Sequence, residues 1–237
     1  FGSGSSLKTR ILLDSLVELT AYVPVDISLE HLKVSTASLV SQFPNIDILP
    51  VCADFTTDFD IPSTPRKPKR KIVYFPGSTI GNLDSSLAKQ LLKRIAKICE
   101  PDGGLLVGID LKKDIEKLIA AYDDEKGVTA EFNLNLLRRI NRELDADFDL
   151  GLFEHKAIYN SDYDRIEMHL VSLCEQTVSV GREAIEFHRD ESICTEHSHK
   201  YSVDGFARGA ASAGLKLKKS WTNDKTEFAV LFLEFDD

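Results

Sequence analysis

The first 110 residues alternate between short apolar runs and helical patterns, and this alternation constrains the fold more than any other feature of the chain. We expect strands over residues 22–27, 46–53, 71–75 and 105–109, with helices over 7–20, 28–42 and 83–98 between them. Because short turns connect these elements, the strands are expected to run parallel and to be covered by helices. The sequence therefore predicts an α/β fold with a Rossmann-like sheet.

Residues 112–200 do not continue this alternation. Helical patterns over 112–121 and 129–145 are followed by strand-like runs over 153–159, 165–172, 176–180 and 184–187. The short polar turns between these runs are typical of antiparallel strands. A helix over 202–213 and strands over 215–221 and 227–235 then resemble the end of the first domain. We interpret 1–111 with 201–237 as one domain, and 112–200 as an inserted α+β substrate-binding subdomain.

Composition excludes several classes of function. The formal net charge is −9, which argues against a nucleic-acid surface, since such surfaces are normally basic. No apolar run approaches the roughly 20 residues that span a bilayer. The cysteines are far apart and lack the paired spacing of metal sites, so we expect no metal and a reduced, cytoplasmic protein. We also expect a monomer. These cysteines are Cys52, Cys99, Cys174 and Cys194.

Polar and glycine-containing segments follow the expected strands of the first domain. Ligands of parallel sheets bind at the carboxyl ends of the strands. A Gly2-Ser3-Gly4 loop precedes the first helix, Asp26 ends the next strand, and Asp54-Phe55 ends the one after. A carboxylate at each position could accept hydrogen bonds from the ribose hydroxyls or from the adenine amino group of a cofactor. A helix cap or turn aspartate is an equally common use, but the combined pattern favours S-adenosylmethionine over a dinucleotide.

The segment from Tyr74 to Leu83 is the most distinctive in the chain. Two glycines, two hydroxyl residues and Asn82 follow an apolar strand and precede a helix. This arrangement brings backbone and one amide side chain close to whatever lies beside the reactive atom of the cofactor. Asn82 could also cap the helix that begins near Leu83, and the two roles are compatible.

Nine motifs occur in order along the chain. They are F-G-S-G-S-S-x-K-T-R, Y-V-P-V-D, A-D-F, F-P-G-S-T-I-G-N-L, Y-D-D-x-x-G-V-T-A, F-N-x-N, I-N-R-E-L, R-I-E-M and T-E-x-S-x-K-Y. Together they resemble the histidine-specific N-α-methyltransferases of ergothioneine biosynthesis. The resemblance spans nearly the whole chain but does not include the N-terminal part of the family, which holds the first strand and part of the substrate pocket. We therefore expect these residues alone to expose a sheet edge and to be unstable.

The resemblance implies a site in three parts. S-adenosylmethionine would be bound by Gly2, Ser3, Gly4, Lys8, Asp26, Asp54 and Phe55. The amino-acid substrate, L-histidine, would be oriented for methyl transfer by Asn82 and Tyr122, with Gly77 and Thr79 beside them. Its side chain would contact Met168, Glu196 and Ser198. The implied product is the trimethylated amino acid hercynine.

Glu196 and Ser198 lie two residues apart on a strand-like segment, so both side chains are expected on one face. A carboxylate and a hydroxyl at that spacing could bracket the two nitrogens of an imidazole. An exposed strand face with alternating polar residues is the other interpretation. His197 and His199 should point the opposite way, and no third ligand beside them indicates a metal.

Two other functions remain open from the sequence. Relatives that methylate a tryptophan-derived amine would need different residues at Met168 and Glu196. An inactive, cofactor-binding partner protein would be indicated by loss of the loop glycines or of Asn82. None of these residues is lost, which favours an active enzyme for histidine.

Overall fold

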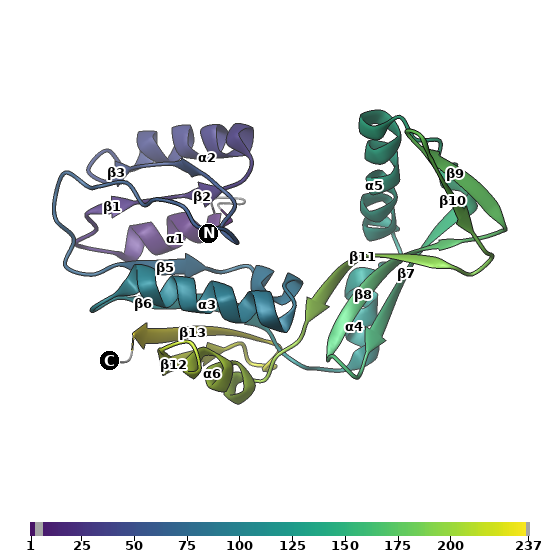
Figure 1. Ribbon diagram of the computed structural model, residues 1–237. Coiled ribbons are helices and arrows are strands. Elements are labelled where there is room, and N and C mark those ends of the chain that lie inside the picture. The colour runs from purple at the N-terminus through teal and green to yellow at the C-terminus, as the bar shows by residue number, and fades with distance from the viewer. Residues whose placement is uncertain (3–6, 236–237) are drawn as a thin grey trace. The chain divides into compact units, whose positions relative to one another are not determined.

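The computed structural model describes residues 1–2 and 7–235 (Figure 1). The chain divides into two compact units, one of Phe1–Asp110 with Ser202–Asp237 and one of Leu111–Tyr201. These divisions are adjacent to the domain boundaries expected from the sequence.

The first unit is built on a mixed sheet. Its four-stranded part has the order β12, β13, β6, β5, in which β5 and β6 are parallel and β13 is antiparallel to both β6 and β12. Two short parallel pairs, β1 with β3 and β2 with β4, belong to the same unit. The strands are β1 (Ala21–Tyr22), β2 (Val25–Asp26), β3 (Asp47–Ile48), β4 (Val51–Cys52), β5 (Ile72–Phe75), β6 (Gly104–Asp110), β12 (Leu215–Thr222) and β13 (Phe228–Phe235).

The expected strands 22–27 and 46–53 are each divided into two pieces. Pro24 and Pro50 lie between the pieces, and proline has no N–H to donate to a neighbouring strand. The register nevertheless continues across the breaks, because Leu49 N donates to Tyr22 O at 3.0 Å and Val51 N donates to Pro24 O at 2.9 Å. The expectation of two continuous strands was therefore wrong, whereas the expected parallel pairing is confirmed.

The first two residues lie between β2 and β5. Phe1 N donates to Tyr74 O at 2.7 Å, while Gly2 N donates to Val25 O at 3.0 Å. One short stretch of backbone thus bonds to both neighbours and joins the parallel pairs to the four-stranded sheet.

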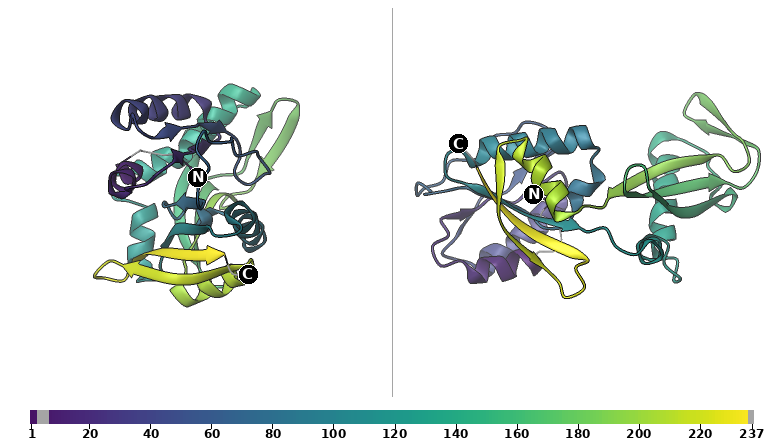
Figure 2. Two further views of the ribbon diagram at one scale, coloured as in Figure 1. Left: turned by 90° about the vertical axis from the view of Figure 1, so that its left-hand side faces the viewer. Right: turned by 90° about the horizontal axis from the view of Figure 1, so that it is seen from below.

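The helices of the first unit are α1 (Leu7–Ser15), α2 (Leu29–Gln42), α3 (Ser85–Cys99) and α6 (Val203–Ala211). Helix α3 packs on β5 and β6, and α6 packs on β12 and contacts α3 (Figure 2). Helix α1 ends at Ser15 rather than at residue 20, where the sequence had placed its end. The Ser15 hydroxyl donates to Ile11 O in the last turn of the helix. Val17, beyond the helix, is 97% exposed, so the apolar pattern after Ser15 does not reflect a buried face.

Helix α3 begins two residues later than expected because Asp84 caps it. The Asp84 carboxylate accepts hydrogen bonds from the backbone N–H groups of Ser86 and Leu87. A 3-10 turn, η1 (Thr79–Asn82), precedes the cap. Asn82 is therefore not the N-cap of this helix, which removes one of its two proposed roles.

The second unit packs two helices on a three-stranded antiparallel sheet of order β11, β8, β7. Helices α4 and α5 cover one face, and a hairpin of β9 and β10 completes the unit. The elements are α4 (Ile115–Tyr122), α5 (Val128–Leu144), η2 (Leu150–Leu152), β7 (Phe153–Asn160), β8 (Arg165–Ser172), β9 (Gln176–Val180), β10 (Glu183–Phe187) and β11 (Ser192–His199).

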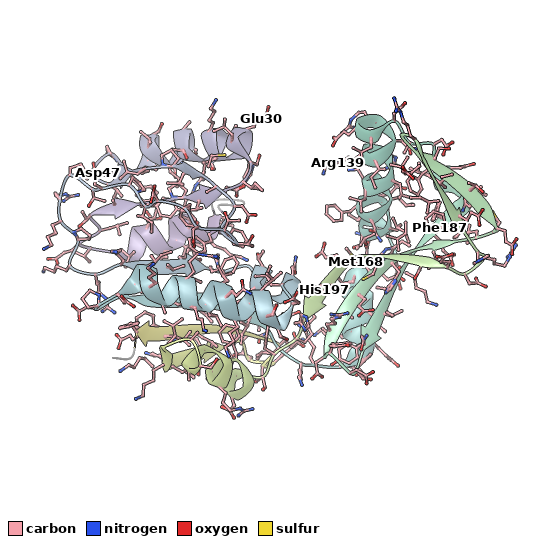
Figure 3. All side chains as sticks on the ribbon, in the orientation of Figure 1. Glu30, Asp47, Arg139, Met168, Phe187 and His197 are labelled. Carbon is pink, nitrogen blue, oxygen red and sulfur yellow. The ribbon has the colours of Figure 1, made fainter. Side chains whose placement is uncertain are left out.

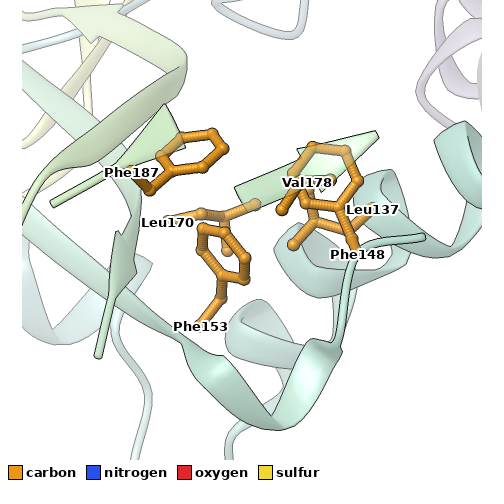
Figure 4. Packing of buried hydrophobic residues seen from close by; sticks show 6 residues of the cluster. All are labelled: Leu137, Phe148, Phe153, Leu170, Val178 and Phe187. Carbon is orange, nitrogen blue, oxygen red and sulfur yellow. The ribbon is translucent and has the colours of Figure 1, made fainter. Parts of the chain in front are cut away.

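A phenylalanine-rich cluster forms the core of the second unit (Figure 4). It joins α5 to the sheet and the hairpin and consists of Leu137, Phe148, Phe153, Leu170, Val178 and Phe187. The rings of Phe153 and Phe187 meet edge to face with centroids 5.4 Å apart. Across the described part of the chain, no helix is both long enough and apolar enough to cross a membrane.

Candidate functional site

The proposed cofactor residues of the first unit follow parallel strands at their carboxyl ends. Strands β2 and β4 pair with Asp26 opposite Cys52, and Ala53 N donates to Asp26 O at 3.1 Å. Asp26 and Asp54 therefore lie at one edge of the sheet. Gly2 reaches this region with a φ of +65°, a conformation that favours glycine. Ser3 and Gly4 lie outside the described residues, and Lys8 is exposed in the first turn of α1.

The two carboxylates of this edge are held by their own local backbone. Asp26 Oδ1 accepts from Ser28 N at 3.0 Å. Asp54 Oδ1 accepts from the hydroxyl of Thr56 at 2.7 Å and from its backbone N–H at 2.8 Å. These hydrogen bonds from Thr56 lower the pKa of Asp54. Asp54 is thus an ionised hydrogen-bond acceptor at neutral pH.

Phe55 belongs to an aromatic cluster next to this edge. Its ring is stacked on that of Phe1, with centroids 5.8 Å apart and planes 6° from parallel. It also meets the buried ring of Phe75 edge to face at 5.3 Å. This packing fixes the position of the residue that directly follows Asp54.

The turn after β5 presents Asn82 at its end. Ser78, with a φ of 59°, accepts a hydrogen bond from Asp110 N at 2.9 Å, and Ile80 is fully buried. Strand β6 approaches this turn so closely that a Cβ on Gly108 would lie 2.1 Å from Pro76 O. This turn carries three of the expected site residues, Gly77, Thr79 and Asn82. The turn is anchored at its buried residues, while the Asn82 side chain is exposed.

In the second unit, three side chains form a hydrogen-bonded ring that we name the Lys200 triad. The Tyr122 hydroxyl donates to Ser198 Oγ at 3.0 Å, and Lys200 Nζ donates to both oxygens at 2.9 Å. Ser198 is 5% exposed and Lys200 is 2% exposed. The structure therefore brings together two of the expected substrate residues, and it adds Lys200, which the sequence analysis did not select. The T-E-x-S-x-K-Y block contained it, but nothing in that block showed that its side chain is buried.

A second, partly buried hydrogen-bond network includes the backbone of Tyr122. Asn133 donates to His155 Nδ1 at 2.9 Å and accepts from the Thr195 hydroxyl at 2.7 Å. Since His155 Nδ1 accepts, its Nε2 carries the hydrogen and donates to the carbonyl of Tyr122 at 2.8 Å. This network links α5, β7 and β11 to the residue at the end of α4. Asn133, His155 and Thr195 are further residues that the sequence analysis had not placed in the site.

A pocket of about 170 Å³ opens between α5 and the sheet of the second unit. It is lined by Phe132, Asn133, Asn135, Leu136, Arg139, Met168, Thr195 and Glu196, of which Arg139 and Met168 are labelled in Figure 3. A cavity of about 150 Å³ accommodates benzene, so this volume suits a single small ring. Met168 and Glu196, two of the expected side-chain contacts, share this pocket.

A β-bulge explains how neighbouring residues of β11 both reach the pocket. The register of β11 against β8 shifts between Cys194 and Glu196, which leaves Thr195 as the extra residue. Consecutive strand residues normally point to opposite faces, and a bulge changes this alternation. Thr195 and Glu196 both line the pocket as a result.

The opposite face of this sheet carries a separate polar cluster. The ligand atoms of Glu167, His169 and Cys194 lie within 4.8 Å of one another, so three residues with metal-ligating groups do meet there. Burial alone would raise the pKa of Glu167, but hydrogen bonds from Arg165, His169 and Asn160 outweigh it and lower the pKa. The carboxylate is thus engaged by a guanidinium, and the cluster is accounted for as a hydrogen-bonded ion network.

The fold is that of S-adenosylmethionine-dependent methyltransferases. A solved structure of such an enzyme from Clostridium acetobutylicum superposes with a TM-score of 0.54 at 13% identity, covering 98% of this chain and 80% of that one. A profile of histidine-specific, S-adenosylmethionine-dependent methyltransferases matches residues 1–235. The chain belongs to this family, which confirms the fold class, the cofactor and the family expected from the sequence.

Two relatives of known function are similar over most of the chain. A histidine N-alpha-methyltransferase of Mycolicibacterium smegmatis is 40% identical over 235 residues, which are 97% of this chain and 72% of the relative. Ergothioneine biosynthesis protein 1 of Neurospora crassa is 28% identical over 226 residues, which are 93% of this chain and 26% of the relative.

Proposed function

We propose that this protein transfers methyl groups from S-adenosylmethionine to the α-amine of L-histidine and forms hercynine for ergothioneine biosynthesis. The observation that carries the proposal is the pocket of the second unit, where Glu196 and Met168 line a hollow of single-ring size. The family of the chain and its 40% identical relative support the same substrate.

The residues of the first unit fit the proposed cofactor. Asp26 and the ionised Asp54 offer carboxylates at one edge of the sheet, where ribose hydroxyls and an adenine amino group need acceptors. Phe55 offers an aromatic face beside them, and Gly2 permits close approach of the backbone. We assign Ser3, Gly4 and Lys8 to the same site from the family resemblance. When bound, the cofactor supplies a methyl group activated by a sulfonium sulfur.

The chain's own residues position the amine that accepts this methyl group. Asn82, exposed at the end of η1, offers a carbonyl oxygen to amine hydrogens and an NH₂ group to a carboxylate. Tyr122 offers its hydroxyl oxygen to the substrate as an acceptor, because its hydrogen is donated to Ser198. Gly77 and Thr79 shape the turn that carries Asn82. Orientation of a neutral amine along the line of attack supplies much of the rate of such a displacement. The proton released by the α-ammonium passes to water.

The side chain of the substrate occupies the pocket of the second unit. Glu196 accepts a hydrogen bond from a ring N–H, Met168 packs against the ring, and Ser198 contacts the other nitrogen. Histidine carries a single small ring, which the volume of this pocket accommodates. We further propose that the protein acts as a cytoplasmic monomer on the free amino acid, without nucleic acid or membrane.

A turnover assay tests this proposal. Purified protein is incubated with S-adenosylmethionine and either L-histidine or L-tryptophan, and S-adenosylhomocysteine release and product mass are measured. We expect release with histidine only, and a product that carries three added methyl groups. Asn82→Ala should lower kcat/KM by about 100-fold, because the amine loses its orientation.

The exposed Asn45 of the first unit provides the matched control, and Asn45→Ala should leave turnover unchanged. Faster S-adenosylhomocysteine release with tryptophan would indicate that the substrate is a tryptophan-derived amine. Cofactor binding without any turnover would identify an inactive partner protein.

A further inference from the structure

The buried ammonium of Lys200 fixes the hydrogen-bond polarity of two hydroxyl groups. Its Nζ donates to Tyr122 and Ser198 at 2.9 Å each, and it lies 4.6 Å from the centroid of the Tyr122 ring. The backbone N–H of Lys200 donates to Asp164 O at 2.8 Å, which holds the residue in place directly after β11. An ammonium has donors and no acceptor. Both hydroxyl oxygens must therefore act as acceptors toward Lys200.

Inside the triad, one of the two hydroxyl hydrogens is already used. Tyr122 donates its hydrogen to Ser198 Oγ at 3.0 Å. A hydroxyl carries a single hydrogen, so the hydrogen of Ser198 points to an acceptor outside the triad. A group bound beside Ser198 must consequently supply a lone pair.

Glu196 has the opposite requirement. It precedes Ser198 by two residues on β11, after the bulge, so the two side chains share a face about 6.6 Å apart along the strand. An ionised carboxylate accepts hydrogen bonds and cannot donate. This face of β11 therefore presents first an acceptor, at Glu196, and then a donor, at Ser198. A neutral imidazole, with one N–H and one bare nitrogen, matches this order, whereas an imidazolium, with two N–H groups, does not.

We propose that Lys200 is a positioning residue that makes the site select the neutral imidazole of histidine, with its N–H toward Glu196 and its lone pair toward Ser198. This inference rests on the proposed function. Lys200 acts through Tyr122 and Ser198 and does not itself contact the ring. An imidazolium would lose the bond to Ser198 and would place a second positive charge near a buried ammonium.

Other charged and titratable groups surround the site. Arg139 on α5 and Glu196 on β11 line the pocket, His155 on β7 donates to the carbonyl of Tyr122, and Tyr122 itself ends α4. The test therefore needs a ligand that experiences the same protein but keeps a neutral ring. 1,2,4-Triazolylalanine has an N–H and bare nitrogens in a ring of the same size, and it is not protonated in this range.

The experiment is calorimetric titration of L-histidine and of triazolylalanine into protein preloaded with S-adenosylhomocysteine, from about pH 5 to about pH 8. Below the imidazole pKa of about 6.5, the ratio of the Kd of histidine to that of triazolylalanine should rise about tenfold for each unit by which the pH falls. Lys200→Met should flatten this slope and raise the Kd of neutral histidine about tenfold. Lys200→Arg should preserve the slope, and Lys156→Met, at an exposed lysine of β7, should match the wild type.

A flat ratio in the wild-type protein overturns the inference without any variant, so a misfolded Lys200→Met protein cannot conceal the result. A folded Lys200→Met protein with the wild-type slope overturns it as well. Histidine that binds with equal affinity in both ring states contradicts this inference alone. Failure of histidine to bind at any pH contradicts the proposed function.

Discussion

The two units of this protein gather polar side chains in different ways. At the sheet edge of the first unit, each carboxylate is held by a residue two positions further along the chain, Ser28 for Asp26 and Thr56 for Asp54. In the second unit, Tyr122 and Ser198 are 76 residues apart in sequence, and Asn133 and Thr195 are 62 apart. The first arrangement follows from local sequence and parallel strands. The second arrangement exists only when the whole second unit is folded. The function of the second unit should therefore be more sensitive to substitutions in its hydrophobic core.

The largest effect is expected from a cavity in the core of the second unit. Leu170 is fully buried among phenylalanine rings, and Leu170→Ala should destabilise this unit by about 2–5 kcal/mol. The only tryptophan, Trp221, lies in β12 of the first unit. Urea unfolding followed by circular dichroism should therefore show an earlier transition, while the transition followed by tryptophan fluorescence keeps its midpoint.

Leu144→Ala, at a residue of α5 that is 56% exposed, is the control and should change stability by less than about 0.5 kcal/mol. A shift of the Trp221 transition equal to that of circular dichroism would show that the two units unfold as one. The two units would then not differ in their sensitivity to a cavity in the core of the second unit.

A smaller and more local effect is expected at the sheet edge of the first unit. Asp54→Ala removes a charged acceptor, worth about 1.5–3 kcal/mol, and should weaken S-adenosylhomocysteine binding by about 10- to 100-fold in calorimetry. Asp47 begins β3, at the opposite end of the strands, and Asp47→Ala should bind as the wild type does. Equal losses in both variants would mean that Asp54 acts through net charge and does not contact the cofactor.

The smallest effect concerns the pH dependence of Asp54. Its pKa is lowered in the folded protein by Thr56, so its contribution to stability is present above the unfolded pKa and is lost as the pH falls through the folded value. Thr56→Ala should raise this pKa toward about 3.9, which carboxyl-carbon NMR titration measures directly. An unchanged pKa would show that the local turn does not control this carboxylate.

The sequence predicted what local patterns determine. Alternation of strands and helices identified the α/β class, and residues after strand ends identified the edge that carries Asp26 and Asp54. Its errors also have local causes. Pro24 and Pro50 divide two strands, and Asp84 rather than an earlier residue caps α3.

The parts of the site that depend on distant contacts could not be predicted. Lys200 was part of a recognised motif, but a lysine is usually exposed, and only the folded unit shows that it is 2% exposed and bonded to Tyr122. The bulge at Thr195 is likewise a property of strand register. Neither feature has a signature in the spacing of residues along the chain.

The central claim is that the second unit recognises the imidazole of histidine through Glu196. The measurement that tests it most directly is calorimetric titration of L-histidine into wild-type and Glu196→Gln protein, both preloaded with S-adenosylhomocysteine, with Glu186→Gln at an exposed residue of β10 as the control. We expect the Kd of histidine to rise about 10- to 100-fold in Glu196→Gln alone, with unchanged affinity for S-adenosylhomocysteine. An unchanged Kd of histidine in Glu196→Gln, or tighter binding of L-tryptophan by the wild type, would contradict the account.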